Sequence, residues 1–364
     1  MKLKDILQVL EEKAPTSLQE SYDNSGLITG NKEMEITGAL ICLDSIESVL
    51  DEAIKLKFNL VIAHHPIVFS GLKKINGKNY VERAIIKAIK HDIAIYAIHT
   101  NLDNVYAGVN SKICEKLGLV NTRILSQKGD LKKLVTFAPI EHVEAVRKAV
   151  FDAGAGTIGN YDECSFNVQG EGTFRGKTGA QPFIGKVGER HTEHEVRLEF
   201  ILESYWEREI IAALKANHPY EEVAYDVYTL SNQNQFTGSG MIGELKEAMP
   251  FPDFLNHLKS VMLTNCIRYT KQVSIEVKRI AVCGGSGSFL LSEAKAAKAD
   301  VFVTADLKYH QFFDADNSLV IADIGHYESE QFTGELLHDF LKEKFATFAV
   351  RLSEINTNPV NYYS

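Results

Sequence analysis

The sequence predicts an α/β protein with a bilobed core and one inserted domain. Two stretches, residues 36–104 and 277–345, alternate apolar strands with helices. That alternation is typical of largely parallel sheets covered by helices. The stretch between them has a different order of strands and helices, and 364 residues are more than one hydrophobic core usually serves. We therefore expect two or three folding units.

The two alternating stretches place polar residues at strand ends. The predicted strands of the core are 36–44, 58–66, 93–103, 277–285, 299–306 and 318–326, and its predicted helices are 45–57, 81–92, 289–299 and 327–345. In open α/β sheets the reactive groups lie just past the carboxyl ends of the strands. Four candidates fall there: His64, Asp103, Asp306 and His326.

The middle of the chain predicts a ferredoxin-like domain. Its predicted strands are 131–139, 161–176, 194–203 and 222–230, and its predicted helices are 140–154 and 206–219. This β-α-β-β-α-β order is that of the split βαβ unit. We therefore expect a core made of residues 1–130 and 231–364, interrupted by an inserted domain at 131–230.

The composition indicates which kinds of partner the protein binds and the compartment in which it is found. The formal net charge of −9 works against sequence-independent binding of nucleic acid, which needs clustered Lys and Arg. The five cysteines are odd in number and never spaced C-x-x-C, as is typical of reduced thiols in a cytoplasmic protein. No apolar window approaches the length of a membrane span. We expect a cytoplasmic protein with neither a membrane nor a nucleic-acid partner.

Two adjacent histidines, His64 and His65, end an apolar run and are followed by Pro66. Neighbouring side chains in an extended strand point to opposite faces, so a single metal ion could hardly accept both. Two ions about 3.5–4 Å apart could take one histidine each. Taken alone, the pair is better explained by chance than by a metal site, because the chain has twelve histidines.

The other strand ends add possible ligands. His99 and Asp103 follow one predicted strand, and His326 ends another, with Glu330 one helical turn later. Each spacing is a weak signal by itself, and Glu330 alone would also suit a solvated helix surface. Because all these segments end strands of the same core, together they predict a metal site.

Two further motifs near strand ends have alternative interpretations. "CGGSGS" follows a strand and opens a helix, so Gly285, Ser286 and Gly287 could form either a phosphate-binding loop or a tight turn. "TADLKYH" offers Asp306 and His310 as an acid–base or supporting pair, or as a surface turn.

A third motif, "NHPYEEVAYD", lies between a helix and a strand of the inserted domain. It gathers four polar side chains, those of His218, Tyr220, Glu221 and Glu222. We interpret it as a gate or a partner contact, with an ordinary solvated loop as the alternative.

Seven short motifs, in order along nearly the whole chain, resemble those of the Nif-three-like family of dinuclear metal-centre proteins. Its members are commonly named GTP cyclohydrolase 1 type 2 homologues. The motifs are "YDNSGL" at 22–27, "AHHP" at 63–66, "HTNLD" at 99–103, "CGGSGS" at 283–288, "TADLKYH" at 304–310, "GHYESE" at 325–330 and "TNPV" at 357–360. One departure is Tyr22, where the family often has Trp.

The resemblance implies a ligand set and an assembly. The implied metal ligands are His64, His65, Asp103, His326 and Glu330, with Glu330 bridging two divalent ions. Zn, Fe, Mn and Ni all suit such ligands. The resemblance further implies that the insertion is similar to PII or CutA proteins and that the protein forms a ring-shaped homohexamer.

A metal-dependent hydrolase acting on a nucleotide is the function that we predict from these features. In GTP, ring opening at guanine C8 would release formate, with His99 or His310 moving protons and the "GGSGS" loop or Lys308 holding the triphosphate. Phosphoester hydrolysis would use the same ions. A non-enzymatic metal carrier or sensor, or a regulatory scaffold ring, is the alternative class.

Overall fold

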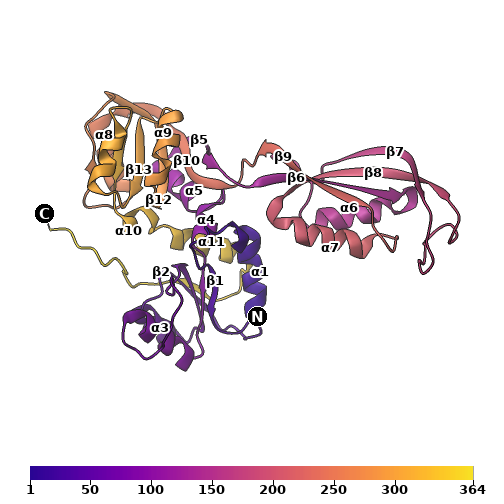
Figure 1. Ribbon diagram of the computed structural model, residues 1–364. Coiled ribbons are helices and arrows are strands. Elements are labelled where there is room, and N and C mark those ends of the chain that lie inside the picture. Colours follow the sequence, from indigo (N-terminus) through magenta and orange to yellow (C-terminus); the bar gives the residue numbers. More distant parts are fainter. Residues whose placement is uncertain (364) are drawn as a thin grey trace. The chain divides into compact units, whose positions relative to one another are not determined.

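The computed structural model describes residues 1–363 and divides into two compact units. Unit 1 combines Met1–Gln127 with the chain from Gln235 onward, and unit 2 is Lys128–Asn234. The insertion predicted at 131–230 lies within unit 2. Each unit has its own sheets (Figure 1). Each also has its own buried apolar core.

The first sheet of unit 1 has the order β1-β4-β3-β2-β15. Its strands are β1 (Gly26–Thr29), β2 (Ala39–Asp44), β3 (Leu60–His65), β4 (Ala94–Ala97) and β15 (Val350–Leu352). The strands β15, β2, β3 and β4 are parallel, whereas β1 is antiparallel to β4. The crossover helices α2 (Glu47–Leu56) and α3 (Tyr80–Lys90) bury apolar residues against one face of this sheet.

The second sheet of unit 1 has the order β11-β14-β13-β12-β10-β5. Its strands are β5 (Leu119–Gln127), β10 (Gly238–Pro250), β11 (Arg268–Tyr269), β12 (Glu276–Ser286), β13 (Val301–Ala305) and β14 (Val320–Asp323). Only β12, β13 and β14 are parallel to one another. Neither β5 nor β10 was predicted from the sequence; the two strands pair with each other from the two sides of the insertion.

A shared core joins the two sheets of unit 1. Tyr96 of the first sheet and Val282 and Val303 of the second belong to one buried apolar cluster. The other helices of the unit are α1 (Leu3–Lys13), α4 (Thr100–Asp103), α5 (Val109–Leu117), α8 (Phe251–Val261), α9 (Leu291–Ala296), α10 (His326–Glu330) and α11 (Thr333–Lys344). α11 packs on the first sheet, α5 packs on the second, and the two helices contact each other. None of the helices in residues 1–363 has the length and apolar character of a membrane span.

Two predicted boundaries in the core were wrong. The strand expected at 93–103 ends at Ala97, because the backbone N–H groups of His99 and Thr100 donate to the side chains of Asn101 and Asp23 instead of continuing the sheet. Residues 100–103 form the helical turn α4. The helix expected at 327–345 is divided into α10 and α11.

Unit 2 has a ferredoxin-like fold, as the sequence predicted. Its antiparallel sheet has the order β7-β8-β6-β9, which is that of a split βαβ unit. The elements are β6 (Asp130–Pro139), α6 (Val143–Asp152), β7 (Ser165–Phe174), β8 (His191–Glu203), α7 (Glu207–Asn217) and β9 (Tyr225–Gln233). Val146 of α6 and Ile210 of α7 share a buried cluster with Leu198 and Phe200 of β8. Similarity to PII or CutA proteins stays a prediction.

Candidate metal centre

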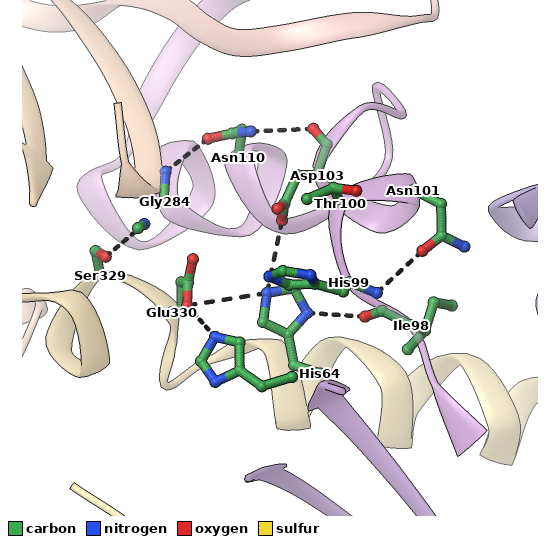
Figure 2. A network of polar contacts seen from close by, with 12 residues as sticks. His64, Ile98, His99, Thr100, Asn101, Asp103, Asn110, Gly284, Ser329 and Glu330 are labelled. Carbon is green, nitrogen blue, oxygen red and sulfur yellow. Dashed lines mark hydrogen bonds and ion pairs between the residues drawn. The ribbon is translucent and has the colours of Figure 1, made fainter. Parts of the chain in front are cut away.

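Five histidines and carboxylates implied as ligands converge within unit 1, although they are far apart in the sequence. They are His64 and His65 at the end of β3, Asp103 at the end of α4, and His326 and Glu330 at the two ends of α10. Figure 2 shows His64, Asp103 and Glu330 of this cluster, with His99 beside them. His64 and His65 end β3 of the first sheet, whereas α10 follows β14 of the second sheet. The convergence therefore depends on how the two sheets of unit 1 pack, in addition to the common edge at which the parallel strands of each sheet end.

Three overlapping groups in this cluster could hold a metal ion: His64 with His65 and His99, His65 with His326 and Glu330, and His64 with Asp103 and Glu330. Within each group, one nitrogen or oxygen atom per residue lies within 4.8 Å of the others. The adjacent histidines do not splay apart as in a regular strand, since their ring centroids are only 5.0 Å apart. Each nevertheless belongs to a different group with Glu330.

Glu330 occupies the centre of the cluster and is buried. Its Oε2 lies 2.9 Å from His65 Nε2, 3.1 Å from His326 Nε2 and 3.9 Å from His64 Nε2. Asp103 Oδ1 lies 3.7 Å from His64 Nε2 on another side. The carboxylate of Glu330 thus lies near both ligand pairs, His64 with Asp103 and His65 with His326.

The four imidazoles are oriented by oxygen atoms outside the cluster. In each ring Nδ1 lies 2.6–2.8 Å from an acceptor: Ile98 O for His64, Asp44 for His65, Asp23 for His99 and Asp306 for His326. Each Nδ1–H therefore donates outward, and the Nε2 atom remains to face the cluster. Outer hydrogen bonds of this kind fix the tautomer and the ring orientation of metal-binding histidines.

Sequence reasoning missed two of these orienting residues and paired a third wrongly. Asp23 and Asp44 were not singled out, and Asp306 was paired with His310, whereas it contacts His326. A signal for Asp44 was present, because it ends a buried strand that lies beside β3 in parallel register with His65. Asp23, which reaches His99 from a loop, lies in the motif "YDNSGL" at 22–27, but no role was assigned to it.

Two buried atoms in the cluster lack hydrogen-bond partners. Among residues 1–363, His64 Nε2 and Asp103 Oδ1 are both buried and unsatisfied, since their 3.7 Å separation is too long for a hydrogen bond. Unsatisfied buried polar atoms are costly and rare in proteins. A cation between them would satisfy both, and imidazole nitrogen with carboxylate oxygen suits divalent transition metals.

Neighbouring side chains in the cluster shift one another's pKa values. Burial and the neighbouring Glu330 raise the pKa of Asp103 to about 7. Burial would lower the pKa of His65 and of His326, but hydrogen bonds to Asp44, Asp306 and Glu330 outweigh it and raise these values to about 9 and about 11. Metal binding needs neutral imidazoles, so an ion would have to displace these protons.

The structure separates the two proposed proton carriers. The ring of His99 lies 5.3 Å from that of His64 and 5.4 Å from that of His65, measured between centroids. His310 lies outside the cluster, where its exposed ring stacks on Phe313. Of these two histidines, His99 lies beside the cluster and His310 does not.

The glycine loop gives space to Glu330. Gly285 has a φ of +59°, and a Cβ there would collide with Glu330 Oε1. Its N–H donates to Ser329 Oγ at 2.9 Å, and the N–H of Gly284 donates to Asn110 at 3.0 Å. The N–H groups of Gly284 and Gly285 thus already have acceptors within the protein. The phosphate-binding role of Gly285, Ser286 and Gly287 stays a prediction.

Comparison with known proteins identifies the family. The model of the family described as Duf34/NIF3 (NGG1p interacting factor 3) matches residues 1–359. The chain belongs to the Duf34/NIF3 family. Among its relatives, a GTP cyclohydrolase 1 type 2 homolog of Bacillus subtilis is 40% identical over 364 residues, covering 98% of this chain and 97% of the relative. A homolog of the same name from Halalkalibacterium halodurans is 39% identical, covering 98% of both chains.

A solved member of the Duf34/NIF3 family has the same fold. The crystal structure of a Bacillus cereus protein related to NIF3 superposes with a TM-score of 0.87 at 38% identity. The match covers 100% of this chain and 99% of the other. These comparisons confirm the resemblance that the motifs indicated.

The cluster of candidate ligands in this Duf34/NIF3 chain opens into a cavity of about 750 Å³. Its lining includes Tyr22 and Phe69, which are 63% and 51% exposed and whose ring centroids are 6.3 Å apart. The described residues that line it include Glu20 and Asp44 but neither Lys nor Arg. The walls therefore offer aromatic surface and negative charge, and their cationic groups are the histidines of the cluster.

Proposed function

We propose that the protein is a metal-dependent hydrolase that acts on a nucleotide at a centre of two divalent ions. His64, Asp103 and Glu330 would hold one ion, and His65, His326 and Glu330 the other. The observation that carries this proposal is that Glu330 is common to both groups and lies between their histidines. The unsatisfied atoms of His64 and Asp103 support it.

Bound divalent ions would supply Lewis acidity and a nucleophile from water near neutral pH. The chain itself contributes orientation and proton transfer. Asp44, Asp306 and the Ile98 carbonyl hold the ligand rings so that Nε2 faces the cluster. His99 donates its Nδ1–H to Asp23, so its Nε2 can take a proton at the cavity side and return it to a leaving group.

The cavity walls suit the base of a nucleotide better than its phosphates. Tyr22 and Phe69 offer aromatic faces on which a planar ring can stack. The segment between the lining residues Leu72 and Asn79 carries exposed lysines at 73, 74 and 78. A nucleotide would therefore enter base first, with its phosphates left toward this segment, which favours ring opening over phosphoester hydrolysis.

The printed name of the relatives, GTP cyclohydrolase 1 type 2 homolog, makes GTP the first substrate to test. Protein reconstituted anaerobically with Zn, Fe, Mn or Ni would be incubated with GTP while formate and phosphate are followed separately. Formate release supports ring opening, and phosphate alone supports a phosphatase. Neither product with any of the four metals would defeat the hydrolase proposal for GTP and favour a metal carrier.

A double variant, Lys73→Ala with Lys74→Ala, tests the orientation of the substrate. If the phosphates lie at this segment, the variant should raise KM for GTP and leave KM for guanosine unchanged. Equal effects on the two substrates would contradict the base-first orientation without touching the hydrolase proposal. Lys55→Ala, an exposed lysine in α2, provides the matched control.

A further inference from the structure

Unit 2 contains a second cavity, of about 730 Å³, which the metal chemistry does not use. It is lined by β7, by residues 175–183 that follow it, and by the loop at 220–224 that the sequence analysis singled out. Along β8, Val196 and Leu198 face the helices, so the alternating Glu195 and Arg197, which line the cavity, belong to the opposite face of the sheet.

Glu195 is a buried carboxylate in this cavity, with 9% of its surface exposed. Its Oε1 accepts a hydrogen bond from the Tyr220 hydroxyl at 2.7 Å. Its Oε2 lies over β7 at Gly172, where a Cβ would collide with it. The hydroxyl and the glycine therefore fix the carboxylate at the wall of the cavity.

Glu195 has no cationic partner among residues 1–363. The imidazole of His218 is held neutral, because Nε2–H donates to the Phe137 carbonyl at 2.9 Å while Nδ1 accepts the backbone N–H of Tyr220 at 3.1 Å. Arg197 donates to Glu199 at 2.9 Å. A buried carboxylate without a paired cation is costly, so Glu195 is poised to receive a cation from outside.

Two further aromatic rings lie beside Tyr220, the hydrogen-bond partner of Glu195. Phe174 and Phe183 lie 6.0 Å and 6.3 Å from Tyr220, measured between ring centroids. All three rings line the cavity. Aromatic faces attract organic ammonium groups, most strongly in desolvated sites.

We propose that the cavity of unit 2 binds a small organic cation, with its ammonium group against Glu195 and its apolar body against Phe174, Phe183 and Tyr220. Arg175 and Lys177 also line the cavity, but so do Glu171, Glu221 and Glu222, and these residues are not buried. Glu195 is therefore the residue that favours a positively charged ligand over a neutral one. The proposal is independent of the hydrolase, since none of these residues belongs to the metal cluster.

Three probes of similar size and different charge test the proposal on the full chain. Phenethylammonium, 2-phenylethanol and 3-phenylpropionate would be titrated calorimetrically into protein freed of metal by a chelator, so that the amine cannot bind an ion. We expect saturable binding of phenethylammonium and weaker binding of the other two. Equal affinity for the amine and the alcohol, or no binding of the amine, would overturn the proposal.

Variants then locate the charge. Glu195→Gln should weaken phenethylammonium binding by on the order of 10- to 100-fold, the range for hydrogen bonds to charged groups, and leave 2-phenylethanol unchanged. Glu193→Gln is the matched control, because this carboxylate lies on the same strand but binds His191. Phe183→Ala, a change at a half-exposed ring, should weaken both ligands. An unchanged amine affinity in Glu195→Gln would overturn the assignment.

Discussion

The cavities of unit 1 and unit 2 have similar volumes but are lined by different kinds of side chain. The cavity of unit 1, about 750 Å³, contains histidines and carboxylates that lie hundreds of residues apart in sequence, and each imidazole has its own outer acceptor. The cavity of unit 2, about 730 Å³, has aromatic walls and one buried carboxylate, which come from β7, β8 and the loops at 175–183 and 220–224.

The two cavities differ in the partners of their buried charged groups. In unit 1 the buried carboxylate of Glu330 lies against the half-buried imidazoles of His65 and His326, and their opposite charges compensate one another. In unit 2 Glu195 is buried with a neutral hydroxyl as its hydrogen-bond partner. A cluster with an excess of ligand atoms suits metal ions, whereas a single carboxylate among rings suits an organic cation.

The largest expected effect is in unit 1. Glu330→Gln should remove both ions, because the same carboxylate serves both groups. Elemental analysis after anaerobic reconstitution measures the loss. Glu328→Gln is the matched control, since Glu328 is also buried in α10 but accepts a hydrogen bond from Asn358 outside the groups. Loss of one ion only in Glu330→Gln would assign this residue to a single position.

A smaller effect should separate His99 from His310. If the protein hydrolyses GTP, His99→Gln should slow turnover by about 10²–10⁴-fold, the usual contribution of a general acid or base, with metal content retained. His310→Gln should leave the rate unchanged, because its ring lies outside the cluster. Metal loss in His99→Gln would instead make His99 a ligand, as its group with His64 and His65 allows.

The outer acceptors should matter less than the ligands. Asp44→Asn removes the charge that orients His65 and should weaken metal affinity by about 10- to 100-fold, measured by competition with a chelator. Asp51→Asn in α2, an exposed residue paired with Lys87, should have no effect. Equal affinities in the two variants would show that the orientation of His65 does not depend on Asp44.

The smallest effect is in unit 2 and depends on pH. Burial lowers the pKa of His218, so the unfolded chain takes up this proton first as the pH falls. The stability of unit 2 is then complete above about pH 6.5 and falls below it, by at most about 1.4 kcal/mol for each pH unit. Fluorescence of Trp206, the single tryptophan, which lies in unit 2, follows unfolding.

His218→Gln should flatten this pH dependence between pH 7.5 and 5.5. His194→Gln, which changes a histidine with an exposed side chain, should leave it as in the wild type. The same slope in both variants would assign the pH dependence to other groups.

Local patterns in the sequence determined the elements and the composition of the site. Alternating apolar strands and helices predicted the parallel core of each lobe, and the changed order of the middle segment predicted the ferredoxin-like unit. The strand-end positions predicted for His64, Asp103 and His326 marked them as possible ligands of one site. That they meet depends on how the two sheets of unit 1 pack, because β3 and β14 belong to different sheets.

Only the tertiary structure decided which partner each side chain has. Asp23 and Asp44 reach histidines that lie 76 and 21 residues away, and Asp306 contacts His326 although His310 is its neighbour in sequence. The pairing of β5 with β10 spans the insertion and has no local signal. In unit 2, nothing in the sequence distinguishes Glu195 from the other acidic residues. Only the fold buries its carboxylate against Tyr220 and Gly172 without a cationic partner. Periodicity reports which face of a strand is buried, whereas contacts between segments depend on how the strands pair and pack.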